Sequence, residues 1–215
     1  MAGLHGKKYI LWDHDGVLVD TEKWYYEATR RALSELGISI EKTQYLDFMQ
    51  DGISLWNLAS EKGIPAEIIQ TYKDKRNTYY QDYLIRQDIE IPGVIKTLRA
   101  LSRNHAMAIV TTSKRKDFEL IHCKRSIVKY MDFVLTVEDY SRAKPDPEPY
   151  LTALRRFQAV PREAVVIEDS ARGLRSAVTA GIDCIIVEND FTNTQDFGLA
   201  ALKVGAITEL TGLFS

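Results

Sequence analysis

The chain has little of several features that mark particular classes of protein. It has two cysteines in 215 residues, Cys123 and Cys184, which excludes a disulfide-rich scaffold and predicts two buried thiols. Lysine and arginine number 28 against 30 for aspartate and glutamate, so there is no basic surplus to bind nucleic acid or an anionic membrane. We therefore expect the partner to be a small soluble molecule.

Long apolar runs are also missing. No stretch approaches the roughly 18 consecutive apolar residues that a membrane span needs. Residues 1–8 contain no apolar segment typical of a secretory signal, and we expect a cytoplasmic protein. A chain of 215 residues can form one substantial domain, or a core with a smaller inserted domain.

Two aspartates follow the first apolar run of the sequence. Residues 9–12 have the pattern of a short buried strand, and Asp13 and Asp15 come directly after it. Side chains alternate along an extended backbone, so both carboxylates would share one side while His14 points away, unless the strand end already bends. Two carboxylates this close repel each other. A hard divalent cation, a phosphoryl group or a shared proton would relieve that repulsion.

Two simpler interpretations of this stretch fit less well. A solvated turn leaves the apolar residues on both sides unexplained. A calcium loop of the helix-loop-helix type needs glycine at its sixth position and glutamate at its twelfth. Here Gly16 occupies the fourth position, which excludes that loop.

The rest of the chain has two different patterns. From Glu22 to about Gln87 the periodicity is helical throughout, with helices expected over about 22–37, 42–49, 55–62 and 66–87. From Ile91 onward short apolar runs alternate with helical segments, which indicates a parallel sheet. The strands expected there are 107–110, 133–136, 164–167 and 184–187, and the helices are 94–103, 117–123, 147–157 and 171–180. With residues 9–12 this predicts a doubly wound α/β fold with five parallel strands, and a ligand crevice at their carboxyl ends.

Polar residues follow three of these later strands. Thr111, Thr112 and Ser113 come after the second strand, where hydroxyl and N–H groups can bind phosphoryl oxygens. Lys144 follows the third strand in the rigid sequence Lys-Pro-Asp-Pro. Glu168 and Asp169 follow the fourth. Helix capping would account for one of these two acids, whereas a metal site accounts for both.

Together these strings resemble the four motifs of the haloacid dehalogenase superfamily, in the same order. The first is Asp-His-Asp-Gly-Val-Leu-Val-Asp-Thr, and the others centre on Thr111, Lys144 and Glu168-Asp169. The resemblance implies a Rossmann-like α/β core formed by residues 1–20 and 89–215. It also implies a helical cap of the C1 type over residues 21–88, folding over the active site.

The resemblance implies a role for each matching residue. Asp13 would be the nucleophile that forms an aspartyl-phosphate, and Asp15 the general acid and base. Thr111 and Lys144 would orient the phosphoryl group. The implied cofactor is Mg²⁺, held by Asp13, Asp169 and the backbone carbonyl of Asp15, with Glu168 supporting its water shell. Substrate-binding candidates are Thr112, Ser113, Gly52 and Ser54.

The resemblance allows four functions. Asp15 and Asp169 argue against a dehalogenase, which lacks the metal site. A phosphatase of a sugar phosphate or phosphoglycolate-like monoester is preferred to a β-phosphoglucomutase-like enzyme. Those mutases have histidine where this chain has Tyr25, and arginine where it has Leu55. A phosphometabolite sensor without catalysis is a further alternative, which turnover of a generic phosphomonoester would exclude.

Overall fold

The chain folds into two compact units. The computed structural model describes residues 6–214. By its internal contacts, the chain up to Asp20 and from Glu90 onward forms one unit, which we name the core unit. Thr21–Ile89 forms the other, which we name the helical unit.

A six-stranded sheet runs through the core unit, in the order β3-β2-β1-β4-β5-β6, and each neighbouring pair of strands is parallel. The strands are β1 (Tyr9–Trp12), β2 (Ala106–Val110), β3 (Phe133–Leu135), β4 (Ala164–Glu168), β5 (Asp183–Val187) and β6 (Leu202–Val204). Central β1 has β2 on one side and β4 on the other, in register at Tyr9 with Ala106 and with Ala164. The parallel α/β architecture predicted from the sequence is confirmed.

The prediction of five strands was wrong by one. Strand β6 was not predicted, because it lies at the sheet edge and its first two residues, Leu202 and Lys203, are exposed. Only Val204 is buried, so the segment has no apolar run of its own. The hydrogen bonds that β6 makes with β5 are tertiary, and a local pattern does not reveal them.

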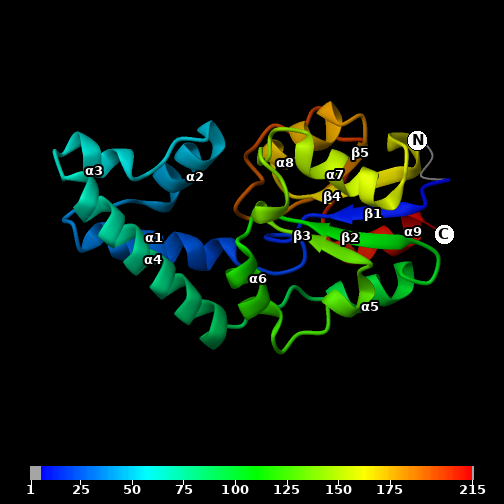
Figure 1. Cartoon of the computed structure of the whole chain (residues 1–215), viewed down its shortest axis with the longest axis horizontal. Coiled ribbons are helices and arrows are strands. Elements are labelled where there is room, and N and C mark those ends of the chain that lie inside the picture. The colour runs from blue at the N-terminus through cyan, green and yellow to red at the C-terminus, as the bar shows by residue number, and fades with distance from the viewer. Residues whose placement is uncertain (1–5, 215) are drawn as a thin grey trace. The chain divides into compact units, whose positions relative to one another are not determined.

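Helices cover both faces of the sheet (Figure 1). α7 (Glu148–Phe157) and α8 (Ala171–Thr179) lie on one face, and α5 (Val94–Leu101) and α9 (Leu210–Leu213) on the other. α6 (Arg115–His122) follows β2. The described residues of the unit also form four 3₁₀ turns: η1 (Val128–Tyr130), η2 (Val137–Asp139), η3 (Pro161–Glu163) and η4 (Ile207–Glu209).

Successive side chains of a strand point to opposite faces of the sheet, which explains why helices cover both faces. On β1, Leu11 belongs to the buried cluster that also contains Tyr150 of α7 and Leu174 of α8. Its neighbours Ile10 and Trp12 are equally buried but project to the opposite face. A strand that is apolar on both faces is stable only between two helical layers.

The helical unit contains α1 (Glu22–Ser34), α2 (Lys42–Asp51), α3 (Asn57–Glu61) and α4 (Ala66–Arg86). Helices α1 and α4 pack on each other, and the rings of Tyr25 and Tyr80 meet edge to face with centroids 5.2 Å apart. No strand occurs among the described residues of this unit, as its helical periodicity predicts.

The two chain segments of the core unit meet at the point where the chain leaves this unit and later returns to it. Val19 forms an antiparallel bridge with Glu90, and a parallel bridge with Asp15. The whole helical unit is therefore inserted between two residues that are neighbours in the core unit.

The two cysteines differ in exposure. Cys184 is buried in β5, as predicted, but the prediction of a buried Cys123 was wrong. Cys123 follows the last residue of α6 and is exposed because the helix ends there. Within residues 6–214, no helix is both long and apolar enough to cross a bilayer.

Candidate active site

Three neighbouring strands end in polar residues at one edge of the sheet. Asp13 follows β1, Thr111 follows β2, and Glu168 is the last residue of β4. Since β1 lies between β2 and β4 with all three parallel, these ends lie side by side. The backbone N–H of Asp13 donates to the carbonyl of Ile167 at 2.8 Å, which extends the β1–β4 pairing to the first carboxylate.

Lys144 connects these strand ends. Its ammonium donates to Asp13 Oδ1 at 2.5 Å, Val110 O at 2.9 Å and Glu168 Oε1 at 2.8 Å. An ammonium has three N–H donors, and all three are used here. Although burial acts to lower the pKa of Lys144, the two carboxylates raise it, so this lysine is charged. Its side chain also lies over the ring of Tyr150, 4.7 Å from the centroid.

Asp13 is buried among more negative than positive charge. Burial, and then the carboxylate of Glu168, raise the pKa of Asp13 to about 7, against the lowering effect of Lys144. One ammonium does not balance two buried carboxylates. A second cation at this point would therefore be strongly favoured.

Glu168 is held by five donors. Its Oε1 accepts from Lys144 and from the hydroxyl of Tyr150, at 3.0 Å. Its Oε2 accepts from the N–H of Asp169 and from the N–H and hydroxyl of Ser170, at 3.0 to 3.1 Å. Burial acts to raise the pKa of Glu168, but Lys144 and these donors lower it, so Glu168 is ionised.

Asp169 lies against the loop that follows β1. A Cβ atom built on Gly16 would lie 2.2 Å from Asp169 Oδ2, and φ at Gly16 is +85°, so only glycine fits. The Asn189 side chain donates to the same oxygen at 2.7 Å. Asn189 therefore fixes the orientation of Asp169.

The acidic groups fit a hard cation. Carboxylate oxygens of Asp13, Glu168 and Asp169 lie within 4.8 Å of one another. Oxygen donors of this kind are those that Mg²⁺ prefers. Because Glu168 already accepts five hydrogen bonds, Asp13 and Asp169 are the carboxylates more available as direct ligands.

Asp15 is held by residues that follow β2. Its Oδ2 accepts from the hydroxyl of Ser113 at 2.6 Å and from that of Thr111 at 3.2 Å. The N–H of Ser113 in turn donates to Thr111 Oγ1 at 3.0 Å. His14 also contacts Asp15 Oδ2, at 3.2 Å through Nδ1, instead of pointing away from it. Alternation ends here because the chain already turns at Gly16, where φ is positive.

Other predicted site residues are not joined to this cluster by a described contact. Thr112 is half-buried in the loop after β2. Gly52 ends α2 in a left-handed conformation, and Ser54 Oγ accepts from the N–H of Trp56 at 3.4 Å. Both lie in the helical unit, and their role in substrate binding stays a prediction.

Sequence reasoning missed three residues that support the site. They are Asn189 beside Asp169, Tyr150 beside Glu168, and Tyr140, whose hydroxyl donates to the Thr111 carbonyl at 2.7 Å. Burial raises the pKa of Tyr140 to about 12. Asn189 could have been found, because it lies just beyond the carboxyl end of β5 as the motif residues lie beyond other strands.

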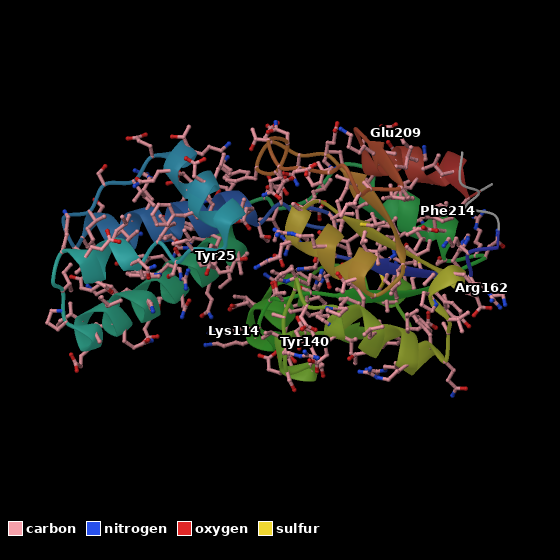
Figure 2. The ribbon with its side chains drawn as sticks, turned by 90° about the horizontal axis from the view of Figure 1, so that it is seen from above. Tyr25, Lys114, Tyr140, Arg162, Glu209 and Phe214 are labelled. Carbon is pink, nitrogen blue, oxygen red and sulfur yellow. The ribbon has the colours of Figure 1, made fainter. Side chains whose placement is uncertain are left out.

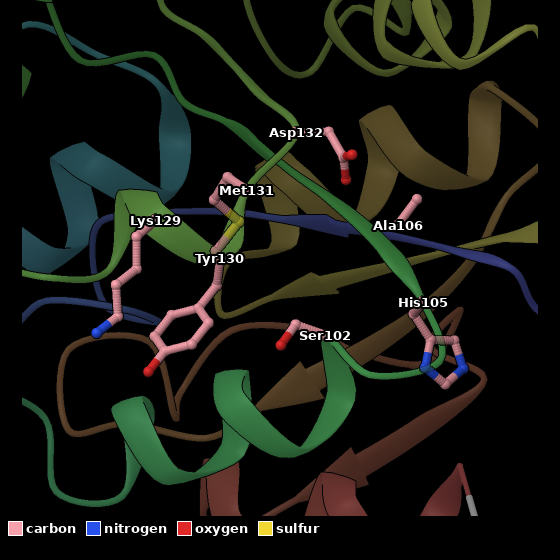
Figure 3. A pocket seen from close by; sticks show the side chains of 7 residues that line it. All are labelled: Ser102, His105, Ala106, Lys129, Tyr130, Met131 and Asp132. Carbon is pink, nitrogen blue, oxygen red and sulfur yellow. The ribbon is translucent and has the colours of Figure 1, made fainter.

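The acidic cluster lies at one end of the core unit, and different residues lie at the other end. Lys114 and Tyr140 lie at the end that carries the acidic cluster, whereas Arg162 and Phe214 lie at the opposite end (Figure 2). A cavity of about 340 Å³ opens near the amino ends of β2 and β3 (Figure 3). It is lined by Ser102, His105, Ala106, Lys129, Tyr130, Met131 and Asp132, none of which belongs to the cluster.

Comparison with known proteins gives one consistent result. The sequence profile of the haloacid dehalogenase-like hydrolases matches residues 10–187. The phosphorylated carbohydrates phosphatase of Thermotoga maritima is 30% identical over 206 residues, which cover 92% of this chain and 91% of that protein. Protein CbbY of Cereibacter sphaeroides is 27% identical over 220 residues, covering 95% and 94%.

Solved structures share the fold. CbbY from Rhodobacter sphaeroides in complex with phosphate superposes with a TM-score of 0.79 at 23% identity, covering 95% of this chain and 96% of that one. A variant in complex with xylulose-(1,5)-bisphosphate gives 0.81 at 22% identity, with the same coverage. With the profile match and the relative at 30% identity, these results assign the chain to the haloacid dehalogenase-like hydrolase family.

Proposed function

We propose that the protein hydrolyses a small phosphorylated carbohydrate, or a phosphomonoester of similar size, through an aspartyl-phosphate on Asp13. The enzyme is a phosphoric monoester hydrolase, as are the relatives named phosphorylated carbohydrates phosphatase and (DL)-glycerol-3-phosphatase 1. One observation carries the proposal: the Asp13 carboxylate accepts from Lys144 and lies within 4.8 Å of Asp169, at the sheet edge where Thr111 and Ser113 hold Asp15.

The first half of the reaction transfers the phosphoryl group to the protein. A carboxylate oxygen of Asp13 attacks phosphorus in line with the leaving oxygen. As that P–O bond breaks, Asp15 gives its proton to the leaving oxygen, which departs as the alcohol. The second half reverses the proton transfer: Asp15 takes a proton from water, and the water oxygen attacks phosphorus to release phosphate and free Asp13.

Charge near phosphorus is controlled by residues that are already fixed. Lys144 offsets the charge of Asp13 as the anionic substrate approaches, and its position is set by Val110 and Glu168. Bound Mg²⁺, held by Asp13 and Asp169 with the backbone carbonyl of Asp15, would neutralise charge on the phosphoryl oxygens. We place the helical unit as the cap that selects the alcohol part of the substrate.

Two observations support a carbohydrate substrate and a phosphatase outcome. The relative with 30% identity is named a phosphorylated carbohydrates phosphatase. Leu55, where the mutase pattern has arginine, is buried, with 8% of its surface exposed. An arginine at this position would bury a charge, which carries a large free-energy cost.

The proposal is tested by Asp13→Asn with a panel of sugar phosphates, phosphoglycolate and nucleotides. The parent should release phosphate from a sugar phosphate in the presence of magnesium. The variant should fold normally and lose activity on the order of a thousandfold or more, because an amide is a poor nucleophile. Near-parental turnover by a folded Asp13→Asn protein would remove Asp13 from this role.

A single-turnover measurement separates the phosphatase from a mutase. With a hexose 1-phosphate and no bisphosphate primer, inorganic phosphate should appear in step with substrate loss. Conversion to the hexose 6-phosphate with little phosphate release would favour the mutase.

A further inference from the structure

A pair of histidines lies behind the Asp15 carboxylate. His14 is fully buried, and its Nε2 lies 2.8 Å from Nε2 of His122, the last residue of α6. On the other side of its ring, His14 Nδ1 lies 3.2 Å from Asp15 Oδ2. A continuous line of polar contacts therefore runs from α6 through His14 to Asp15.

The contacts of this pair allow one self-consistent arrangement of protons. The Nδ1 atom of His122 is buried and has no hydrogen-bond partner among residues 6–214. An N–H there would be a buried unpaired donor, so the proton of His122 belongs on Nε2. That N–H donates to His14 Nε2, which must then be the acceptor. The proton of His14 is consequently on Nδ1, where it donates to Asp15 Oδ2.

The opposite arrangement is unfavourable at both ends. It would bury an unpaired N–H on His122 and place the lone pair of His14 Nδ1 against the carboxylate of Asp15. Burial, and then His14 and Arg125, lower the pKa of His122 to about 3, so this ring is neutral and has one N–H to give. Phe118, one helical turn before His122, packs on both histidine rings at 5.0 and 4.4 Å between centroids.

We propose that His122 is a positioning residue for Asp15, acting by fixing the tautomer of His14 so that an N–H, and not a lone pair, faces the Asp15 carboxylate. The inference rests on the proposed acid and base role of Asp15. With Thr111 and Ser113, His14 gives Asp15 Oδ2 a third donor and fixes the plane of the carboxylate. His122 itself touches no reacting atom.

A purely structural pair would behave differently. If the two rings only filled space, any apolar residue of similar size at position 122 would preserve catalysis, and the tautomers would be irrelevant. If they position Asp15, the loss of the His122 donor should affect the steps that move a proton more than the step that does not.

The tautomers can be measured without any assay of activity. In ¹⁵N-labelled parent protein at neutral pH, NMR correlation of ring nitrogens with ring protons should show His14 protonated on Nδ1 and His122 on Nε2. The reverse pattern would overturn the inference, whether or not the protein proves to be a phosphatase.

Kinetics of two variants then test the function of the pair. His122→Leu removes the donor, whereas His122→Gln keeps an N–H at a similar distance along the side chain. We expect the leucine variant to lose roughly tenfold or more in kcat for an alkyl phosphate, whose leaving oxygen needs a proton. The first-turnover burst with p-nitrophenyl phosphate, whose leaving group needs no proton, should stay within about twofold of the parent.

The controls separate failure of this inference from failure of the proposed function. The glutamine variant should recover most of the activity, and His105→Leu, which removes a half-buried ring near the amino end of β2, should leave kcat unchanged. Equal loss of the burst and of alkyl phosphate turnover, or no loss in the leucine variant, would overturn the inference. Full activity in Asp15→Asn would instead overturn the proposed function.

Discussion

Glycine is required at two positions of this protein, because acidic side chains occupy the space that a Cβ atom would fill. Gly16 leaves room for Asp169, and Gly173 of α8 leaves room for Glu168. At Gly173 an added Cβ would lie 1.6 Å from Glu168 Oε1, the oxygen that also accepts from Lys144. The charge cluster therefore depends on two positions that carry no functional group.

Gly173→Ala tests this dependence. The Glu168 side chain cannot move aside easily, because it is fully buried and held by five donors. We expect a loss of about 1–3 kcal/mol in the free energy of unfolding, together with a marked fall in kcat. Gly212→Ala, where nothing lies within 4 Å of the added Cβ, is the matched control. Parental stability and activity in Gly173→Ala would show that Glu168 has room to relax.

Removal of the Asp169 carboxylate should act on the metal. Asp169→Ala takes away one of the two most available ligands while leaving Asp13 and Lys144 in place. The magnesium concentration for half-maximal activity should rise about tenfold or more. Asp196→Ala, in which the lost carboxylate accepts from the N–H of exposed Gly198, should leave the magnesium titration unchanged. An unchanged titration in Asp169→Ala itself would place the metal elsewhere.

Among the elements, the start of α8 serves both stability and the site. Ser170 is the N-cap, and its hydroxyl oxygen accepts from the N–H of Gly173 at 3.1 Å. The same hydroxyl donates to Glu168 at 3.0 Å. One side chain thus caps a helix and holds the carboxylate that anchors Lys144.

Ser170→Ala should lower the free energy of unfolding by about 1 kcal/mol from loss of the cap alone. In a chain of this size that corresponds to a fall in Tm of about 2–4 °C. Ser102→Ala, where the hydroxyl donates to a carbonyl at the C-terminal end of α5, should change Tm far less. Equal Tm values for the two variants would show that the Ser170 cap adds no more stability than the Ser102 hydroxyl does.

The strands that could be predicted from the sequence are those in which consecutive residues are apolar and buried. β1, β2, β4 and β5 have apolar runs because both of their faces are covered, and the sequence shows this directly. β6 has no such run, since Leu202 and Lys203 are exposed and only the hydrogen bonds to β5 define the strand.

The same distinction applies to the site. Lys144, Glu168 and Asp169 lie in strings long enough to match a family pattern, so they could be named in advance. Asn189 and His122 are single polar residues at the ends of a strand and a helix. The place of Asn189 after β5 marks it only as a candidate. The contacts that make both residues important are with neighbours far along the chain, which a sequence without its fold does not reveal.

At the scale of the whole molecule, the bridge between Val19 and Glu90 means that the helical unit can be deleted and the chain rejoined over a short distance. Excision of residues 21–89, with two or three glycines joining Asp20 to Glu90, should leave a core unit that unfolds cooperatively. Bridged residues have Cα atoms only about 4.5–5.5 Å apart, so a short linker is sufficient.

The shortened chain should still be stabilised by magnesium, measured as a rise in Tm, because every proposed ligand lies in the core unit. The same chain carrying Asp169→Ala should show no such rise. A core that fails to unfold cooperatively would show that the helical unit is needed for folding.

The three hydrogen bonds of Lys144 Nζ have a mechanical consequence. They tie the ends of β1, β2 and β4 to a single atom, through Asp13, the Val110 carbonyl and Glu168. The ammonium thereby links three adjacent strands at one point. A substitution in the sheet interior that shifts one of these strands along its axis would move the ammonium, and the Asp13 carboxylate bonded to it would move as well. A mutation distant from the acidic cluster would thus displace the Asp13 carboxylate, and a larger strand displacement would move it further.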